Sequence, residues 1–101
     1  MSFYEIFRSI LEDCGFELTD FHNIEMSSEY NAQSFGIEGS ELHLFLVKRT
    51  QGALIFLQSL TRENPLLHFK ISEEDLSCNR ELEFYAHFVK KQIEIIKNEP
   101  R

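Results

Sequence analysis

The residues of this 101-residue chain that most often bind metals or act as nucleophiles are its four histidines and two cysteines. The histidines fall in four separate segments, and none lies at a chelating distance in sequence from another histidine or a cysteine. These residues are His22, His43, His68, His87, Cys14 and Cys78. Their separation predicts no metal site, no cofactor and no catalytic residue. We therefore expect the protein not to be an enzyme.

Other sequence features that support chemistry are also missing. The four glycines are isolated, so no glycine-rich loop is present to hold phosphate. The adjacent acids of 73–75 fit the first turn of a helix, where negative charge is favoured by the helix dipole. Basic residues form two small pairs, 48–49 and 90–91, and direct nucleic-acid binding needs a longer basic stripe.

The sequence also predicts where the protein acts. The longest apolar run, 53–57, is far shorter than the roughly 20 residues that cross a bilayer. The first residues include an acid and show neither a basic region nor a small-residue cleavage site, so no signal peptide is expected. Two distant cysteines do not resemble the disulfide framework of a small secreted domain. We expect a cytoplasmic protein with reduced thiols and no membrane contact.

The apolar pattern predicts helices first and last, with strands between them. Apolar residues recur at helical spacing over 3–14 and again over 79–97. The intervening segments alternate apolar and polar residues or are apolar throughout, and glycine or proline turns separate them. The predicted strands are 42–48, 53–60 and 66–71, preceded by one or two shorter strands at 18–26 and 31–38.

This order predicts a single α+β domain covering 1–101. Its N-terminal helix is followed by an antiparallel meander of three to five strands and a long C-terminal helix, with both helices on one face of the sheet. The predicted core combines one face of each element. It consists of Phe7, Leu11, Leu44, Leu46, Ile55, Leu57, Phe69, Tyr85, Val89 and Ile93.

Charge is divided unequally along the chain. Residues 1–47 contain nine acids and one base, a net charge of −8, whereas residues 48–101 contain eight acids and nine bases. Such an asymmetry affects partners and association rates rather than the fold. It predicts a basic protein partner bound through acids interleaved with aromatic residues. The predicted partner-binding residues are Glu17, Asp20, Glu25, Glu29, Tyr30, Glu38 and Glu41.

In size, acidity and lack of catalytic motifs, the chain resembles the immunity proteins that bacteria carry against their own toxins. The resemblance is one of general character and rests on no family motif. It implies an inhibitor whose carboxylates cover the cationic active site of a toxin nuclease. Two alternatives remain open: a type III-like secretion chaperone, which would wrap an extended peptide along apolar grooves, and a phage-encoded inhibitor or regulatory binding protein.

Overall fold

The structure, a computed structural model, describes residues 3–25 and 31–98. Five strands lie between an N-terminal helix and a C-terminal helical pair. In chain order the elements are α1 (Phe3–Asp13), β1 (Leu18–Glu25), β2 (Asn31–Ile37), β3 (Leu42–Arg49), β4 (Gly52–Ser59), β5 (Leu67–Ile71), α2 (Glu73–Leu76) and α3 (Asn79–Lys97).

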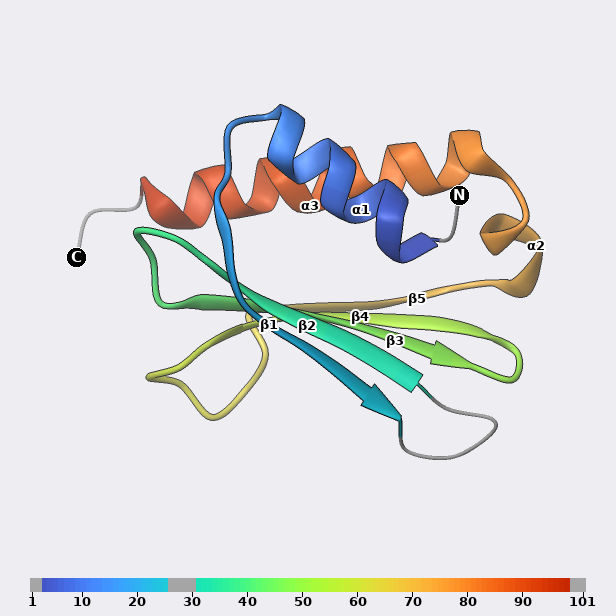
Figure 1. The fold of residues 1–101 in the computed structure, drawn as a ribbon, viewed down its shortest axis with the longest axis horizontal. Coiled ribbons are helices and arrows are strands. Elements are labelled where there is room, and N and C mark those ends of the chain that lie inside the picture. The colour runs from blue at the N-terminus through green and yellow to red at the C-terminus, as the bar shows by residue number, and fades with distance from the viewer. Residues whose placement is uncertain (1–2, 26–30, 99–101) are drawn as a thin grey trace.

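The elements form two layers. The strands make one antiparallel sheet in the order β1-β2-β3-β4-β5, and α1 and α3 pack side by side over one of its faces (Figure 1). The α+β class, the meander and the placement of both helices on one face are therefore confirmed. No helix in the described ranges 3–25 and 31–98 is long and apolar enough to cross a membrane.

The turns follow from residues that tolerate unusual backbone angles. Gly15 has φ +93° and closes α1, with the Phe16 N–H bonded to the Leu11 carbonyl at 3.1 Å. Gly52 has φ +99° in the β3–β4 hairpin, where a Cβ would lie 2.4 Å from the Ile71 carbonyl oxygen. Only glycine fits that position, because a side chain would meet both backbone strain and a clash.

Two helices follow the last strand, and only the first begins with a side-chain cap. Ser72 caps α2, and its hydroxyl accepts the N–H of Asp75 at 3.2 Å. Ser77 ends α2, Asn79 is the first residue of α3, and Cys78 between them makes no side-chain cap. The chain therefore makes one short turn of helix, α2, before α3 begins at the end of the sheet where β5 ends (Figure 1).

The core lies between the sheet and the helices. Eight of the ten predicted core residues are buried there, whereas Phe69 and Tyr85 are half-buried and pack against the core. That part of the prediction is wrong because Phe69 belongs to the edge strand β5, where it stacks on Tyr85 with ring centroids 5.5 Å apart. The core residues that were not predicted include Phe35, Ile37 and Ile71.

Candidate acidic interface

Carboxylates gather at one end of the molecule, where α1 ends, β1 begins and β2 turns into β3 (Figure 1). All but Glu41 are exposed, and Glu41 is half-buried. We call this surface the acidic end; it comprises Glu12, Asp13, Glu17, Asp20, Glu38 and Glu41.

Backbone contacts place these acids beside one another. The Glu38 N–H donates to the Glu17 carbonyl at 2.9 Å, so the start of β1 and the β2–β3 turn are adjacent. Glu12 and Asp13 lie in the last turn of α1, which contains no base. Negative charge there is disfavoured by the helix dipole, typically by about 0.3–1 kcal/mol per group. The arrangement therefore does not follow from helix stability.

The one base of residues 1–47 does not neutralise this surface. Arg8 lies in α1, and its guanidinium sits 4.3 Å from the ring centroid of Phe21. Phe21 in turn stacks on the buried Phe35 with centroids 5.8 Å apart. Arg8 is thereby engaged between α1 and β1 in a cation–π contact.

A bulge in β1 positions Asp20. Thr19 pairs with Gly36 and His22 pairs with Ser34, so Asp20 and Phe21 together oppose the single residue Phe35. Asp20 has φ +49°, a conformation that aspartate tolerates better than most residues. The extra residue turns Phe21 toward Phe35 and leaves Asp20 exposed at the rim of the sheet.

The β2–β3 turn is held by several hydrogen bonds. The Ser40 hydroxyl donates to the Ile37 carbonyl at 2.8 Å and accepts the Leu42 N–H at 3.2 Å. The Ser40 N–H also donates to the Ile37 carbonyl, and Gly39 supplies the required positive φ of +80°. Glu38 and Glu41 therefore project from a preformed turn.

An open hollow of about 480 Å³ lies between β1 and this turn. Three carboxylates, those of Asp20, Glu38 and Glu41, line it together with His43. Burial lowers the pKa of His43 below its ordinary value; the carboxylate of Asp20 opposes that shift and His22 adds to it. A neutral His43 leaves the negative charge of the hollow intact, so the hollow suits a Lys or Arg side chain.

The lowered pKa of His43 predicts a pH effect on stability. An unfolded histidine titrates near pH 6.5, so as the pH falls from 7 toward 5 the unfolded chain binds a proton before His43 does in the folded protein. The stability that this group provides above pH 6.5 is therefore lost on acidification. His43→Gln should reduce the loss of stability between pH 7 and pH 5, measured by urea unfolding. His87→Gln, on the exposed side of α3, is the control, and equal slopes in both variants would contradict the effect.

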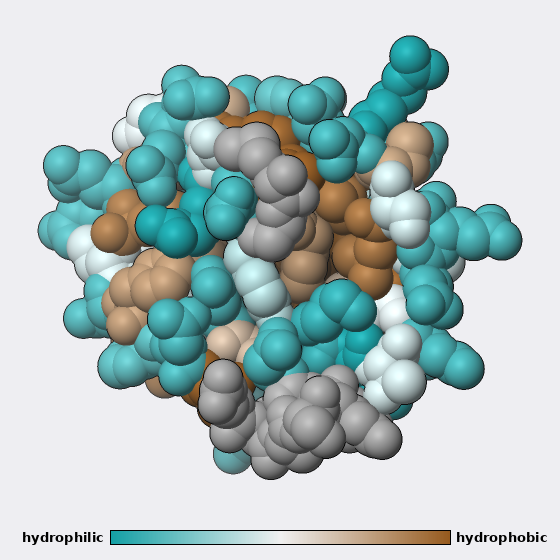
Figure 2. Space-filling model, turned by 45° about the vertical axis from the view of Figure 1, so that its right-hand side comes forward, coloured by the Kyte–Doolittle hydropathy of each residue, from teal (hydrophilic) through white to brown (hydrophobic). Residues whose placement is uncertain are grey.

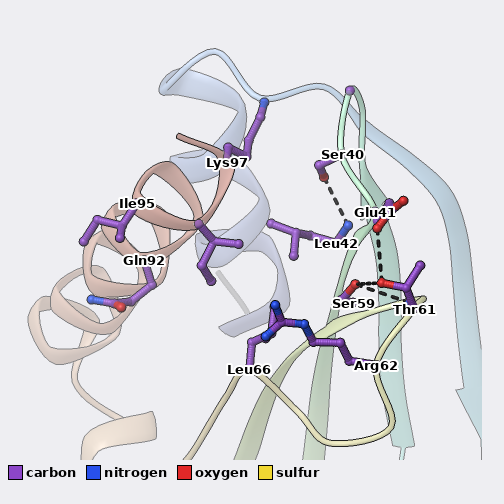
Figure 3. A pocket seen from close by; sticks show the side chains of 12 residues that line it. Ser40, Glu41, Leu42, Ser59, Thr61, Arg62, Leu66, Gln92, Ile95 and Lys97 are labelled. Carbon is purple, nitrogen blue, oxygen red and sulfur yellow. Dashed lines mark hydrogen bonds between the residues drawn. The ribbon is translucent and has the colours of Figure 1, made fainter. Parts of the chain in front are cut away.

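A second hollow of about 700 Å³ adjoins the acidic end on the side of α3 (Figure 3). Glu41 accepts a hydrogen bond from the Thr61 hydroxyl at 3.2 Å, and Thr61 contacts the Ser59 hydroxyl at 2.9 Å. Arg62 and Lys97 line the same hollow, so this side carries positive charge as well. Of these two hollows, only the one beside β1 is lined by carboxylates without lysine or arginine among the described residues.

The structure brings together four of the seven predicted partner-binding residues: Glu17, Asp20, Glu38 and Glu41. Glu25 ends β1 and lies at the opposite end of that strand, about 25 Å from Glu17 by strand geometry. Glu29 and Tyr30 lie outside the described residues. The predicted segment is therefore not one surface.

Sequence reasoning missed two members of the acidic end, Glu12 and Asp13. Their position in the last turn of a helix, just before Gly15, could have indicated a binding role, because acids there are unfavourable for helix stability. Of the aromatic residues interleaved with these acids, Phe35 is fully buried in the core and cannot contact a partner, whereas Phe21 is 39% exposed.

Neither a metal site among the described residues nor a known relative indicates the function. Within 3–25 and 31–98 there is no group of three or more His, Cys, Asp or Glu residues arranged to hold a metal ion. No protein-family model matches the chain, and no curated protein or solved structure is significantly similar to it. The functional proposal therefore depends on the geometry and charge described above.

Proposed function

We propose that the protein is a binding protein that neutralises a basic protein partner in the cytoplasm. The observation that carries the proposal is the acidic end: six carboxylates from the end of α1, the connection into β1, the start of β1 and the β2–β3 turn on one surface. Opposite charge steers the encounter of two proteins and suppresses the wrong partners. The partner that suits this surface presents clustered Lys and Arg side chains.

The partner that we favour is a toxin nuclease, with the protein acting as its immunity protein. A nuclease binds phosphate through Lys and Arg, and the same groups would pair with Asp20 and Glu38 around the open hollow. The bound protein would then exclude nucleic acid both sterically and electrostatically. Because the β2–β3 turn is preformed, less conformational entropy is lost on binding.

Affinity capture tests this proposal. The chain, immobilised and exposed to an extract of the cell that produces it, should retain a basic protein that is released as salt increases, because the Debye length shortens to about 3 Å at 1 M. An unrelated protein of equal size and net charge is the control. One equivalent of the chain should abolish any nuclease activity of the recovered protein. Recovery of a partner without basic character, or retention that is insensitive to salt, would contradict the proposal.

A further inference from the structure

An exposed row of apolar side chains runs along α3 on a face that does not contact the core. Phe84, Phe88 and Ile95 are 65%, 39% and 50% exposed, and their spacings of four and seven place them on one side of the helix. The buried residues of α3, among them Leu82 and Val89, lie on a different side. We call Phe84, Phe88 and Ile95 the outer stripe. A helix of a single folded unit needs one apolar stripe, and α3 has two.

The outer stripe lies beside the edge strand β5. The ring centroids of Phe69, in the middle of β5, and Phe88 are 5.8 Å apart. Among the described residues no strand pairs with the outer edge of β5, so its outward backbone groups are available for pairing. The 700 Å³ hollow continues this side of the molecule, because Leu66, just before β5, and Ile95 both line it (Figure 3).

One face of the molecule mixes apolar and polar areas (Figure 2). In Figure 2, hydrophobic side chains gather in the middle of the view and hydrophilic side chains occupy most of its margin. An edge strand next to an apolar helix face offers both backbone hydrogen bonds and apolar contacts to an incoming strand.

We infer that a second copy of this chain occupies β5 and the outer stripe in a two-fold symmetric dimer. A two-fold axis relates an edge strand to itself in antiparallel orientation, which is the pairing that every neighbouring pair of strands already uses. The two sheets then join into one through β5 and the partner's β5. The two α3 helices lie side by side above the junction.

Charge complementarity supports this occupant. Phe69 contacts Tyr85 and Phe88, so a two-fold axis through Phe69 passes α3 close to Ala86. Because α3 runs back along β5 (Figure 1), the axis sets Phe84 opposite the partner's Phe88. The same axis sets Glu81 opposite the partner's Lys91, since both pairs are centred on Ala86. Each apolar pair is thus flanked by opposite charges.

The paired part of this surface, β5 with Phe84 and Phe88 of α3, lies on other elements than the acidic end, and the two surfaces adjoin only at the 700 Å³ hollow, which Glu41 and Ile95 both line. A dimer through β5 and α3 would present two acidic ends. The dimer and the proposed function can therefore fail independently.

Sedimentation velocity of the full chain from micromolar to millimolar concentration tests the inference. The wild type should sediment as a concentration-dependent dimer. Phe84→Asp should raise the dimer dissociation constant by about 30-fold, as is typical of a central interface residue. Glu81→Lys and Lys91→Glu should each weaken the dimer, and the double variant should restore it because the charge pair is re-formed with its signs exchanged.

Leu60→Asp is the matched control, since Leu60 is 78% exposed and lies outside β5 and α3. It should leave the dimer unchanged. A monomeric wild type at all concentrations would overturn the inference, as would a dimer insensitive to Phe84→Asp. A double charge variant no more stable than the single variants would overturn the antiparallel arrangement on which the inference depends.

Discussion

Replacement of Leu57 by alanine is expected to lower the free energy of unfolding by about 2–5 kcal/mol. Leu57 lies in β4, is fully buried, and pairs with Leu44 on β3 and Leu67 on β5. The substitution removes apolar contacts and leaves a cavity between the sheet and the helices. Such a loss is a large part of the 5–15 kcal/mol typical of a small domain.

Leu54→Ala is the matched control for this prediction. Leu54 belongs to the same strand but alternates to the face without helices, and it is half-buried. Its replacement should cost clearly less than that of Leu57. Urea unfolding of both variants, compared at a common denaturant slope, measures the difference. Equal losses would contradict a core confined to one face of the sheet.

The elements with long, regular apolar patterns could be predicted from the sequence. The range predicted for α3, 79–97, matches Asn79–Lys97, and the predicted strands 42–48 and 53–60 match β3 and β4 within one residue at each end. In α3 the apolar stripe that faces the core repeats over about three turns, from Leu82 to Ile93, and in β3 every second residue from Leu42 to Leu46 is buried. Repeated burial on one side makes the period readable in sequence.

The residues of β1 and β2 were harder to interpret for physical reasons. The bulge at Asp20 shifts the alternation of β1 by one residue. In β2, Gln33 occupies the helix-facing side together with Phe35, and its Oε1 is buried without a hydrogen-bond partner among the described residues. A polar residue on the helix-facing side interrupts the alternation of apolar and polar residues by which a strand is recognised in the sequence. Phe35 and Ile37 were therefore missing from the predicted core.

The acidic interface could be predicted only in part. Counting charges located the excess of acids in residues 1–47. In an antiparallel sheet, however, acids at the two ends of one strand lie at opposite ends of the sheet. Glu17 and Glu38 meet through a backbone hydrogen bond, while Glu25 is carried away along β1. The strand pairing decides which acids share a surface, and the number of charges in a stretch of sequence does not reveal that pairing.

The acidic end should account for most of the affinity for a basic partner. Glu12, Glu17 and Glu38 are exposed and come from three different segments around this surface. Changing all three to lysine replaces attraction by repulsion at the interface. A central interface residue costs about 2 kcal/mol or more and a rim residue much less, so even if only one of the three residues is central the triple variant should bind the partner about 100-fold more weakly.

The control variant changes net charge equally at the opposite end of the molecule. Glu5, Glu74 and Glu83 are exposed residues of α1, α2 and α3, and none belongs to the acidic end or the outer stripe. Lysine at all three gives the same net charge as the first variant. Circular dichroism and thermal unfolding must first show that both variants fold.

The dissociation constants of these two triple variants for the captured partner, compared at one salt concentration, test the acidic-end hypothesis most directly. The hypothesis predicts a loss of about 100-fold for Glu12, Glu17 and Glu38, and a loss of less than about 3-fold for Glu5, Glu74 and Glu83, because exposed charges far from an interface act through screened long-range attraction. Equal losses would mean that net charge alone governs binding. A larger loss in the second variant would place the interface at the opposite end, and either result would contradict the hypothesis.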